Sequence, residues 1–174
     1  MDRLKDAIVP YLTQKEIKDL IKKLARQVES EYKDQEVVLV CPLKGSILFI
    51  ADFMRELNLP QRVDFVKVSG TKGQTGAPVK IIKDISLNIT GKHVLIVEEI
   101  IDEAKTLSFL KSRLMAANPA SLKIITLLDK PARRVVNLKP DFVGKTIEDR
   151  FVVGYGLDEG EIGRNYPDIY YLKH

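Results

Sequence analysis

The chain has 174 residues, of which 45% are hydrophobic and 30% are charged, and its formal net charge is +4. This composition is typical of one globular domain, and no apolar run approaches the roughly 20 residues of a membrane span. The single cysteine, Cys41, excludes an internal disulfide, and two histidines supply a zinc site or a histidine triad poorly. The N-terminus mixes acids with bases and does not resemble a signal peptide, so we expect a cytoplasmic protein.

Hydrophobic periodicity predicts the first elements of the chain. Apolar residues at helical spacing indicate a helix over residues 14–32, with Thr13 as its N-cap. A continuous apolar run over residues 36–43 predicts a buried strand. A glycine-led turn then opens a second helix over residues 44–59, and residues 62–70 read as a second strand. We expect Cys41, inside the first strand, to be a buried structural thiol.

The second half of the chain continues this alternation. Residues 69–78 contain three glycines and no large apolar side chain, which is typical of an exposed loop. Residues 93–99 predict a strand, 106–118 a helix and 122–129 another strand. Shorter extended pieces are expected within 79–93, at 140–147 and at 150–158. Apolar strands alternating with helices predict a parallel sheet covered on both faces.

In such sheets ligands bind beyond the carboxyl ends of the strands, near the point where strand order reverses. We therefore expect the polar residues that follow the strands to converge on one rim. They are Lys44 and Gly45, Ser69 and Gly70, Glu98 to Thr106, and Asp129 and Lys130.

The stretch VLIVEEIIDEAKTL sets four carboxylates directly after an apolar strand. Neighbouring carboxylates repel one another and resist burial unless a cation pairs with them. A helix beginning near Thr106 would direct backbone N–H groups toward a phosphate, and Glu98 and Glu99 suit sugar hydroxyls and magnesium. Asp102 would then be the candidate proton acceptor or donor. The alternative is a solvated acidic loop that caps the strand.

This stretch resembles the phosphoribosyl-diphosphate binding motif of type I phosphoribosyltransferases. The segments PLKGSILF, LLDKPARR, KPDFVGKTI and FVVGYGLDEGEIGR are similar, in order and spacing, to further signature segments of the hypoxanthine-guanine phosphoribosyltransferase family. The resemblance covers Val9 to Tyr171. It implies an α/β fold with a mainly parallel sheet flanked by helices. We expect one domain, 1–174, with a core at about 13–148 and a small hood at about 1–12 and 149–174.

The resemblance implies a purine salvage enzyme. The family transfers the 5-phosphoribosyl group from 5-phosphoribosyl diphosphate to hypoxanthine or guanine, giving IMP or GMP and pyrophosphate, with Mg²⁺. It also implies a homodimer or homotetramer. The preference among hypoxanthine, guanine and xanthine stays open.

The resemblance also implies roles for individual residues. Asp102 would handle the purine N7 proton, Lys130 would donate to the exocyclic oxygen of the base, and Phe151 would stack on its ring. The Leu43–Lys44 peptide is expected to be cis. Phosphoribosyl diphosphate would contact Lys44, Gly45, Glu98, Glu99, Asp102, Glu103, Ala104, Lys105, Thr106 and Arg164. The purine would contact Ile100, Lys130, Phe151, Val152, Leu157 and Asp158. Ser69 and Gly70 would belong to the lid, and Glu98, Glu99 and Asp158 would hold the metal.

Three of these residues have simpler interpretations. Lys130 could be a surface lysine at the end of a strand, and Phe151 could be an ordinary core residue. Arg164 could be a solvated arginine in a polar segment.

The chain departs from the family pattern in its phosphate loop and its lid. The loop normally reads Asp-Thr-Gly-Lys-Thr, but Glu103 and Ala104 replace its threonine and glycine. A carboxylate there repels a phosphate, and a Cβ disfavours the backbone angles that glycine allows. Glu99 replaces an aspartate, which we expect to be tolerated, and the lid lacks the tyrosine that usually follows Ser69.

These departures leave a second hypothesis open, a purine-nucleotide-binding or regulatory protein of the same fold with weak or lost catalysis. RNA binding by the basic surface is a third and weaker one, because aromatic residues are few.

Overall fold

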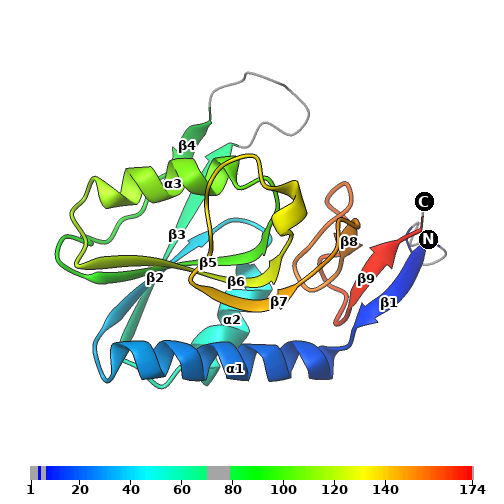
Figure 1. Ribbon diagram of the computed structural model, residues 1–174, viewed down its shortest axis with the longest axis horizontal. Coiled ribbons are helices and arrows are strands. Elements are labelled where there is room, and N and C mark those ends of the chain that lie inside the picture. The colour runs from blue at the N-terminus through cyan, green and yellow to red at the C-terminus, as the bar shows by residue number, and fades with distance from the viewer. Residues whose placement is uncertain (1–3, 5–6, 70–78, 174) are drawn as a thin grey trace.

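The computed structural model describes residues 4, 7–69 and 79–173 (Figure 1). Within these residues a six-stranded sheet forms the centre of the molecule, and every pair of neighbouring strands in it is parallel except β3 and β4. The expected parallel sheet is therefore confirmed. The strand order is β4 (Lys80–Lys83), β3 (Gln61–Ser69), β2 (Val37–Pro42), β5 (His93–Ile101), β6 (Ser121–Asp129) and β7 (Phe142–Thr146).

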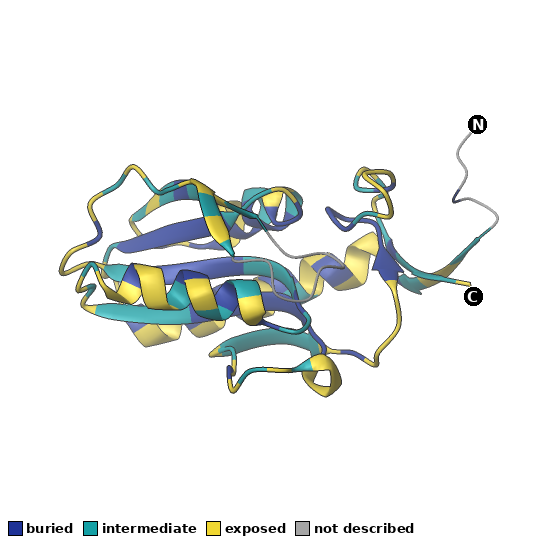
Figure 2. Ribbon diagram, turned by 90° about the horizontal axis from the view of Figure 1, so that it is seen from above, coloured by how far each residue is buried: buried dark blue, intermediate teal, exposed yellow. Residues whose placement is uncertain are grey.

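Helices cover both faces of this sheet, as the alternating sequence predicts. Helices α1 (Gln14–Tyr32) and α2 (Ile47–Glu56) lie on one face, and α3 (Lys105–Met115) lies on the other (Figure 1). Figure 2 shows the strands as the most deeply buried layer between them. Each face has its own core cluster, one packed against α1 and α2 and the other against α3. No helix in the described part of the chain is long and apolar enough to cross a membrane.

Helix α1 begins where its cap predicts. The Thr13 hydroxyl accepts a hydrogen bond from the Glu16 N–H at 3.2 Å, and the Glu16 carboxylate accepts one from the Thr13 N–H at 2.8 Å. This capping box satisfies two backbone groups that a helix start otherwise leaves unpaired. The apolar side of α1 then packs into the core, and burying each aliphatic side chain contributes about 1.5–3 kcal/mol. Its buried residues are Ile17, Ile21, Leu24, Ala25, Val28 and Tyr32.

A second, three-stranded sheet stands at one end of the molecule. Its antiparallel strands are β1 (Ile8–Leu12), β9 (Ile169–Leu172) and β8 (Val152–Val153), in that order. The first and last strands of the chain, β1 and β9, thus lie side by side (Figure 1). All three strands fall in the segments expected to form a hood, and we propose to describe residues 13–148 as the core and the remainder as that hood.

Several element boundaries differ from those expected from the sequence. Helix α2 begins at Ile47, so Lys44 and Gly45 lie in the turn before it, and strand β5 continues two residues further, to Ile101. Strands β1 and β9 were not expected as strands. Cys41 is buried in β2, as expected.

The strand order reverses between β2 and β5, because β3 lies beyond β2 while β6 and β7 lie beyond β5. In parallel α/β sheets this is the point where ligands bind, outside the carboxyl ends of the strands. The pairing of Ile101 with Asp129 aligns the ends of β5 and β6. The short 3₁₀ helix η1 (Pro131–Arg133) follows β6 at the same rim.

Candidate functional site

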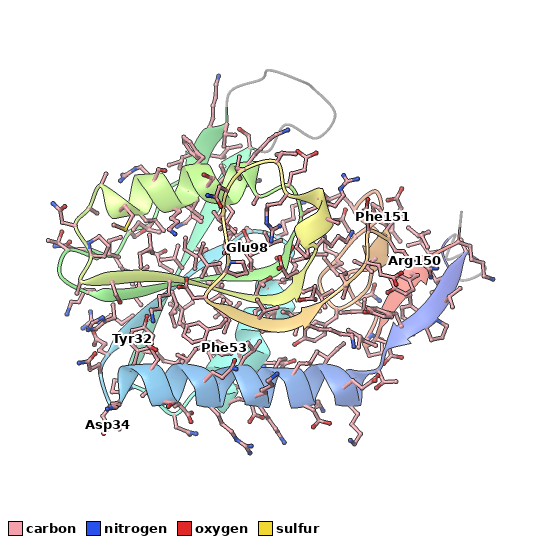
Figure 3. All side chains as sticks on the ribbon, in the orientation of Figure 1. Tyr32, Asp34, Phe53, Glu98, Arg150 and Phe151 are labelled. Atoms are coloured by element: carbon pink, nitrogen blue, oxygen red, sulfur yellow. The ribbon has the colours of Figure 1, made fainter. Side chains whose placement is uncertain are left out.

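A cavity of about 760 Å³ opens at this rim. Its wall is built from the end of β5, the loop and first turn of α3, η1 and a turn of the hood. Figure 3 shows Phe151 beside β8 on the hood and Glu98 over the central sheet, with Tyr32 at the far end of the molecule. The lining residues are Glu98, Ile101, Asp102, Glu103, Ala104, Lys105, Thr106, Leu107, Arg133, Phe151, Asp158, Glu159, Gly160 and Glu161.

The loop from Asp102 to Ala104 turns the chain from β5 into α3. Ala104 is the N-cap and has a left-handed backbone, with φ of 66°, which costs a residue other than glycine about 1–2 kcal/mol. It is only 8% exposed and packs in the core cluster with Ile101 and Leu107, and burying its methyl group returns roughly 0.8 kcal/mol. No side chain of the described residues caps α3, so the N–H groups of its first turn remain available to a ligand in the cavity.

Glu103 does not face the cavity as an isolated charge. Its carboxylate lies 2.9 Å from the ammonium group of Lys105, and the hydrogen bond from Lys105 lowers the pKa of Glu103. A phosphate at the start of α3 therefore meets an ion pair at this point.

Asp102 is paired with Arg133, a residue that the sequence reasoning did not single out. The Arg133 Nε donates to Asp102 Oδ1 at 2.9 Å, and its Nη1 lies 3.6 Å from Asp149 Oδ2. Arg133 belongs to η1, three residues after Lys130, and lines the cavity. The only signal in the sequence was its position just after a strand that ends at the expected rim.

A second arginine, Arg134, joins the ends of β5 and β6. Its Nη1 donates to the backbone carbonyls of Ile101, at 3.1 Å, and of Asp102. Its Nη2 forms an ion pair with Asp129, and both side chains are nearly buried. Arg134 thereby fixes the backbone that carries Asp102.

Glu98 and Glu99 lie side by side at the end of β5. Burial, together with the neighbouring Glu99 carboxylate, raises the pKa of Glu98 well above its usual value, and burial raises the pKa of Glu99 to about 7. The Oε2 atom of Glu99 is buried and has no hydrogen-bond partner within the described residues. Burial therefore disfavours the ionised form of both carboxyl groups, and a bound cation would relieve this cost.

Two glycines allow this close packing. A Cβ at Gly45 would lie 1.8 Å from Glu99 Oε1, so only glycine lets the glutamate lie against the turn after β2. A Cβ at Gly156, whose φ is +95°, would lie 2.1 Å from the Gly45 carbonyl oxygen. The hood therefore rests on this turn through backbone contact. The Leu43–Lys44 peptide before it is cis, as the sequence resemblance implies.

Lys44 and Arg164 both form ion pairs with the hood turn, residues 158–162, beside the cavity. The Lys44 ammonium group lies 2.8 Å from Glu161 Oε2. Arg164 Nη2 lies 2.8 Å from Asp158 Oδ1, and its Nη1 donates to the Gly156 carbonyl at 2.8 Å. Arg164 is mostly buried and paired, which differs from a simple solvated arginine.

Lys130 and Phe151 differ in exposure. Lys130 is only 5% exposed, and burial lowers its pKa. Its ammonium group makes no hydrogen bond or ion pair with the residues that the structure describes, so it is a donor without a partner. Phe151 is 40% exposed and lines the cavity, so it is not a core residue.

Other predicted residues do not line the cavity. Val152 and Leu157 are buried in the first core cluster, and Ile100 packs against it. Ser69 ends β3 and accepts a hydrogen bond from the Lys80 N–H at 3.1 Å. Gly70 lies outside the described residues.

Comparisons with known proteins all indicate the same family. The model of the phosphoribosyl transferase domain matches residues 10–160. A hypoxanthine phosphoribosyltransferase of Salmonella typhimurium is 46% identical over 170 residues, which cover 95% of this chain and 96% of that protein. A hypoxanthine-guanine phosphoribosyltransferase of Aquifex aeolicus is 40% identical, over 93% of both chains. The crystal structure of a hypoxanthine-guanine phosphoribosyltransferase from Bacillus anthracis, with HEPES in its active site, superposes with a TM-score of 0.91 at 41% identity, covering 97% of this chain and 99% of that one.

Proposed function

The chain belongs to the phosphoribosyl transferase domain family, and from this premise we propose that it is a hypoxanthine/guanine phosphoribosyltransferase of purine salvage. The reaction joins N9 of hypoxanthine or guanine to C1 of the ribose of 5-phosphoribosyl diphosphate. The C1–oxygen bond to pyrophosphate breaks, and IMP or GMP is formed.

One observation carries this proposal. The uncapped start of α3 and the exposed face of Phe151 line the same cavity, at the strand ends where Lys130 also lies. A helix start binds a phosphate through backbone N–H groups, while an aromatic face and a fixed donor suit a flat base with an exocyclic oxygen. A nucleoside monophosphate requires both at opposite ends of one ligand.

The proposed roles follow from these positions. Asp102 exchanges the proton at N7 of the purine, and Arg133 holds its carboxylate in place through a hydrogen bond of 2.9 Å. Lys130 donates to the 6-oxo group of the base. Among the described residues, the carboxylates of Asp102 and Asp149 act on its charge, but neither forms a hydrogen bond or ion pair with it. Positive charge develops on the ribose as the diphosphate departs, so the nearby carboxylates also stabilise the transition state.

The diphosphate would lie beside the turn after β2. Lys44 supplies one positive charge there and Arg164 a second, carried by the hood. Lys105 and Thr106 would contact the 5′-phosphate at the other side of the ribose. Charged donors at the position of a leaving group are worth more in the transition state, where its charge grows.

The acid pair of β5 fits a magnesium ion carried by the substrate. Glu99 Oε2 is a buried oxygen without a hydrogen-bond partner among the described residues, and Glu98 adds a second carboxylate beside it. The described residues contain no cluster of three or more metal-ligating side chains, which agrees with an ion held by one or two carboxylates together with substrate phosphates. Mg²⁺ would neutralise the leaving diphosphate. Asp158 would serve such an ion only after releasing Arg164.

The binding-only alternative is not favoured, because the proteins that are similar to this chain over most of its length are named as transferases. The carboxylate of Glu103, which motivated that alternative, is drawn to Lys105. We further propose a cytoplasmic location, and a homodimer or homotetramer as the working assembly.

A direct assay tests the proposed function. Hypoxanthine, guanine, xanthine and adenine are each incubated with 5-phosphoribosyl diphosphate and Mg²⁺, and nucleotide formation is followed by absorbance. We expect turnover of hypoxanthine or guanine, its loss with excess EDTA, and little reaction of adenine, which lacks the 6-oxo group. The absence of product from every base would overturn the proposal, and tight binding of IMP in its place would restore the binding-only hypothesis.

A further inference from the structure

The two cations beside the proposed diphosphate site already share an anion of the chain itself. The same oxygen of Glu161, Oε2, lies 2.8 Å from the Lys44 ammonium group and 3.4 Å from Arg164 Nη2. Lys44 belongs to the core, and 117 residues separate it from Glu161 in the hood. The carboxylate thus bridges the two parts of the molecule at the place where a diphosphate would lie.

The hood turn holds Glu161 in this position. Its backbone N–H donates to Asp158 Oδ2 at 2.9 Å, and its φ of +71° is one that side-chain-bearing residues rarely adopt. Backbone hydrogen bonds at 3.0 and 3.1 Å between Glu159 and Ile162 close the turn. The carboxylate is therefore presented to Lys44 by a defined backbone turn.

Each of the two cations already has a carboxylate partner. Lys44 and Arg164 face the carboxylates of Glu161 and Asp158, and the hydrogen bond from Lys44 lowers the pKa of Glu161. A diphosphate that reaches the same cations meets a carboxylate on the donors that it needs, and like charges so close repel strongly. The two anions therefore compete for the same donors.

We propose that Glu161 is an internal competitor for the diphosphate group. Its carboxylate occupies Lys44 and Arg164 in the empty site, leaves them when phosphoribosyl diphosphate binds, and returns as pyrophosphate departs. This inference rests on the proposed function, since it assigns those two cations to the diphosphate. It predicts that Glu161 weakens the binding of substrate and of pyrophosphate alike, and shortens the residence time of the product.

Pyrophosphate binding measured by titration calorimetry tests this inference. The variant Glu161→Gln keeps the shape of the side chain and removes its charge. Glu159→Gln is a matched control, because Glu159 carries the same charge in the same turn but makes no ion pair within the described residues. Both variants and the unaltered chain are titrated with magnesium pyrophosphate at two salt concentrations, and thermal unfolding confirms that all three are folded.

We expect Glu161→Gln to bind pyrophosphate about threefold to fivefold more tightly than the unaltered chain, with a lower KM for phosphoribosyl diphosphate. Glu159→Gln should change the affinity less than twofold. Equal tightening by both variants would overturn the proposal, because the effect would then be one of net charge, and so would unchanged or weakened binding by Glu161→Gln. The titration needs no turnover. Tighter binding by Glu161→Gln without any nucleotide product would therefore support the role of Glu161 as a competitor and contradict the proposed transferase function.

Discussion

The guanidinium group of Arg134 donates a hydrogen bond to the backbone carbonyl of Asp102, although 32 residues separate the two along the chain. The same side chain pairs with Asp129, whose neighbour is Lys130. One buried arginine therefore fixes the strand end that carries the proposed proton carrier and the strand end that carries the proposed base donor.

Replacement of Arg134 should destabilise the fold as well as the site. Arg134→Met leaves Asp129 buried without its partner, and breaking one side of a buried pair costs about 3–5 kcal/mol. Chemical denaturation measures this loss, and the double variant with Asp129→Asn should recover part of it. Arg113→Met, which breaks an exposed pair with Asp84, is the control and should cost less than about 1 kcal/mol. An unchanged free energy of unfolding for Arg134→Met would show that Arg134 does not fix the two strand ends.

Lys130 should matter for the base and not for the fold. Burial disfavours its charge, so Lys130→Met should unfold at the same temperature as the unaltered chain or above it. Loss of a charged donor to the 6-oxo group should lower kcat/KM for hypoxanthine by about tenfold to a hundredfold. Steady-state kinetics and thermal unfolding separate the two effects, with the exposed Lys92→Met as control. An unchanged kcat/KM would show that a group other than Lys130 donates to the 6-oxo oxygen of the base.

The loop carboxylate Glu103 should weaken substrate binding only modestly. Glu103→Gln releases Lys105 for the 5′-phosphate, and we expect a KM for phosphoribosyl diphosphate about twofold to fivefold lower, since exposed ion pairs are weak. The value of kcat should change little. Steady-state kinetics with Glu148→Gln as control checks this. A raised KM would mean that Glu103 contributes to binding.

Asp64 should make stability depend on acidic pH. Burial acts to raise the pKa of this carboxylate, but hydrogen bonds from the N–H groups of Leu87, Ser86 and Phe65 outweigh burial and lower it. The folded pKa thus lies below the unfolded value of about 3.9, so the stabilisation is complete above that pH and is lost as pH falls through the folded pKa.

We therefore expect Asp64→Asn to cost about 2 kcal/mol at pH 7 and progressively less below about pH 4. Denaturation curves across this range measure the difference, and the exposed Asp19→Asn should show none of it. A cost that stays constant with pH would show that packing, and not charge, is responsible.

Elements with a strong periodic pattern could be predicted from the sequence, and elements stabilised only by distant partners could not. Helix α1 has both its apolar stripe and its Thr13 cap within one segment. Strand β1 is short, contains Pro10, and pairs with β9 at the other end of the chain. Its strand character comes from that partner, which no local pattern displays.

The same distinction applies to the site. Residues that directly follow an apolar strand, such as Asp102 and Lys130, could be placed at the rim because parallel strands end together. The ion pairs formed by Arg133 and Glu161 depend on how η1 and the hood fold over the core. Charged residues in polar segments give no such information before the fold is known.

The central claim is tested most directly by comparing nucleotide formation by the unaltered chain with that by Asp102→Asn. Hypoxanthine, 5-phosphoribosyl diphosphate and Mg²⁺ are supplied at saturation, and IMP is quantified by chromatography. We predict steady production of IMP by the unaltered chain and a kcat about 10²–10⁴-fold lower for Asp102→Asn, as expected for a lost proton carrier. No IMP above background from the unaltered chain, or an equal rate from both proteins, would contradict it.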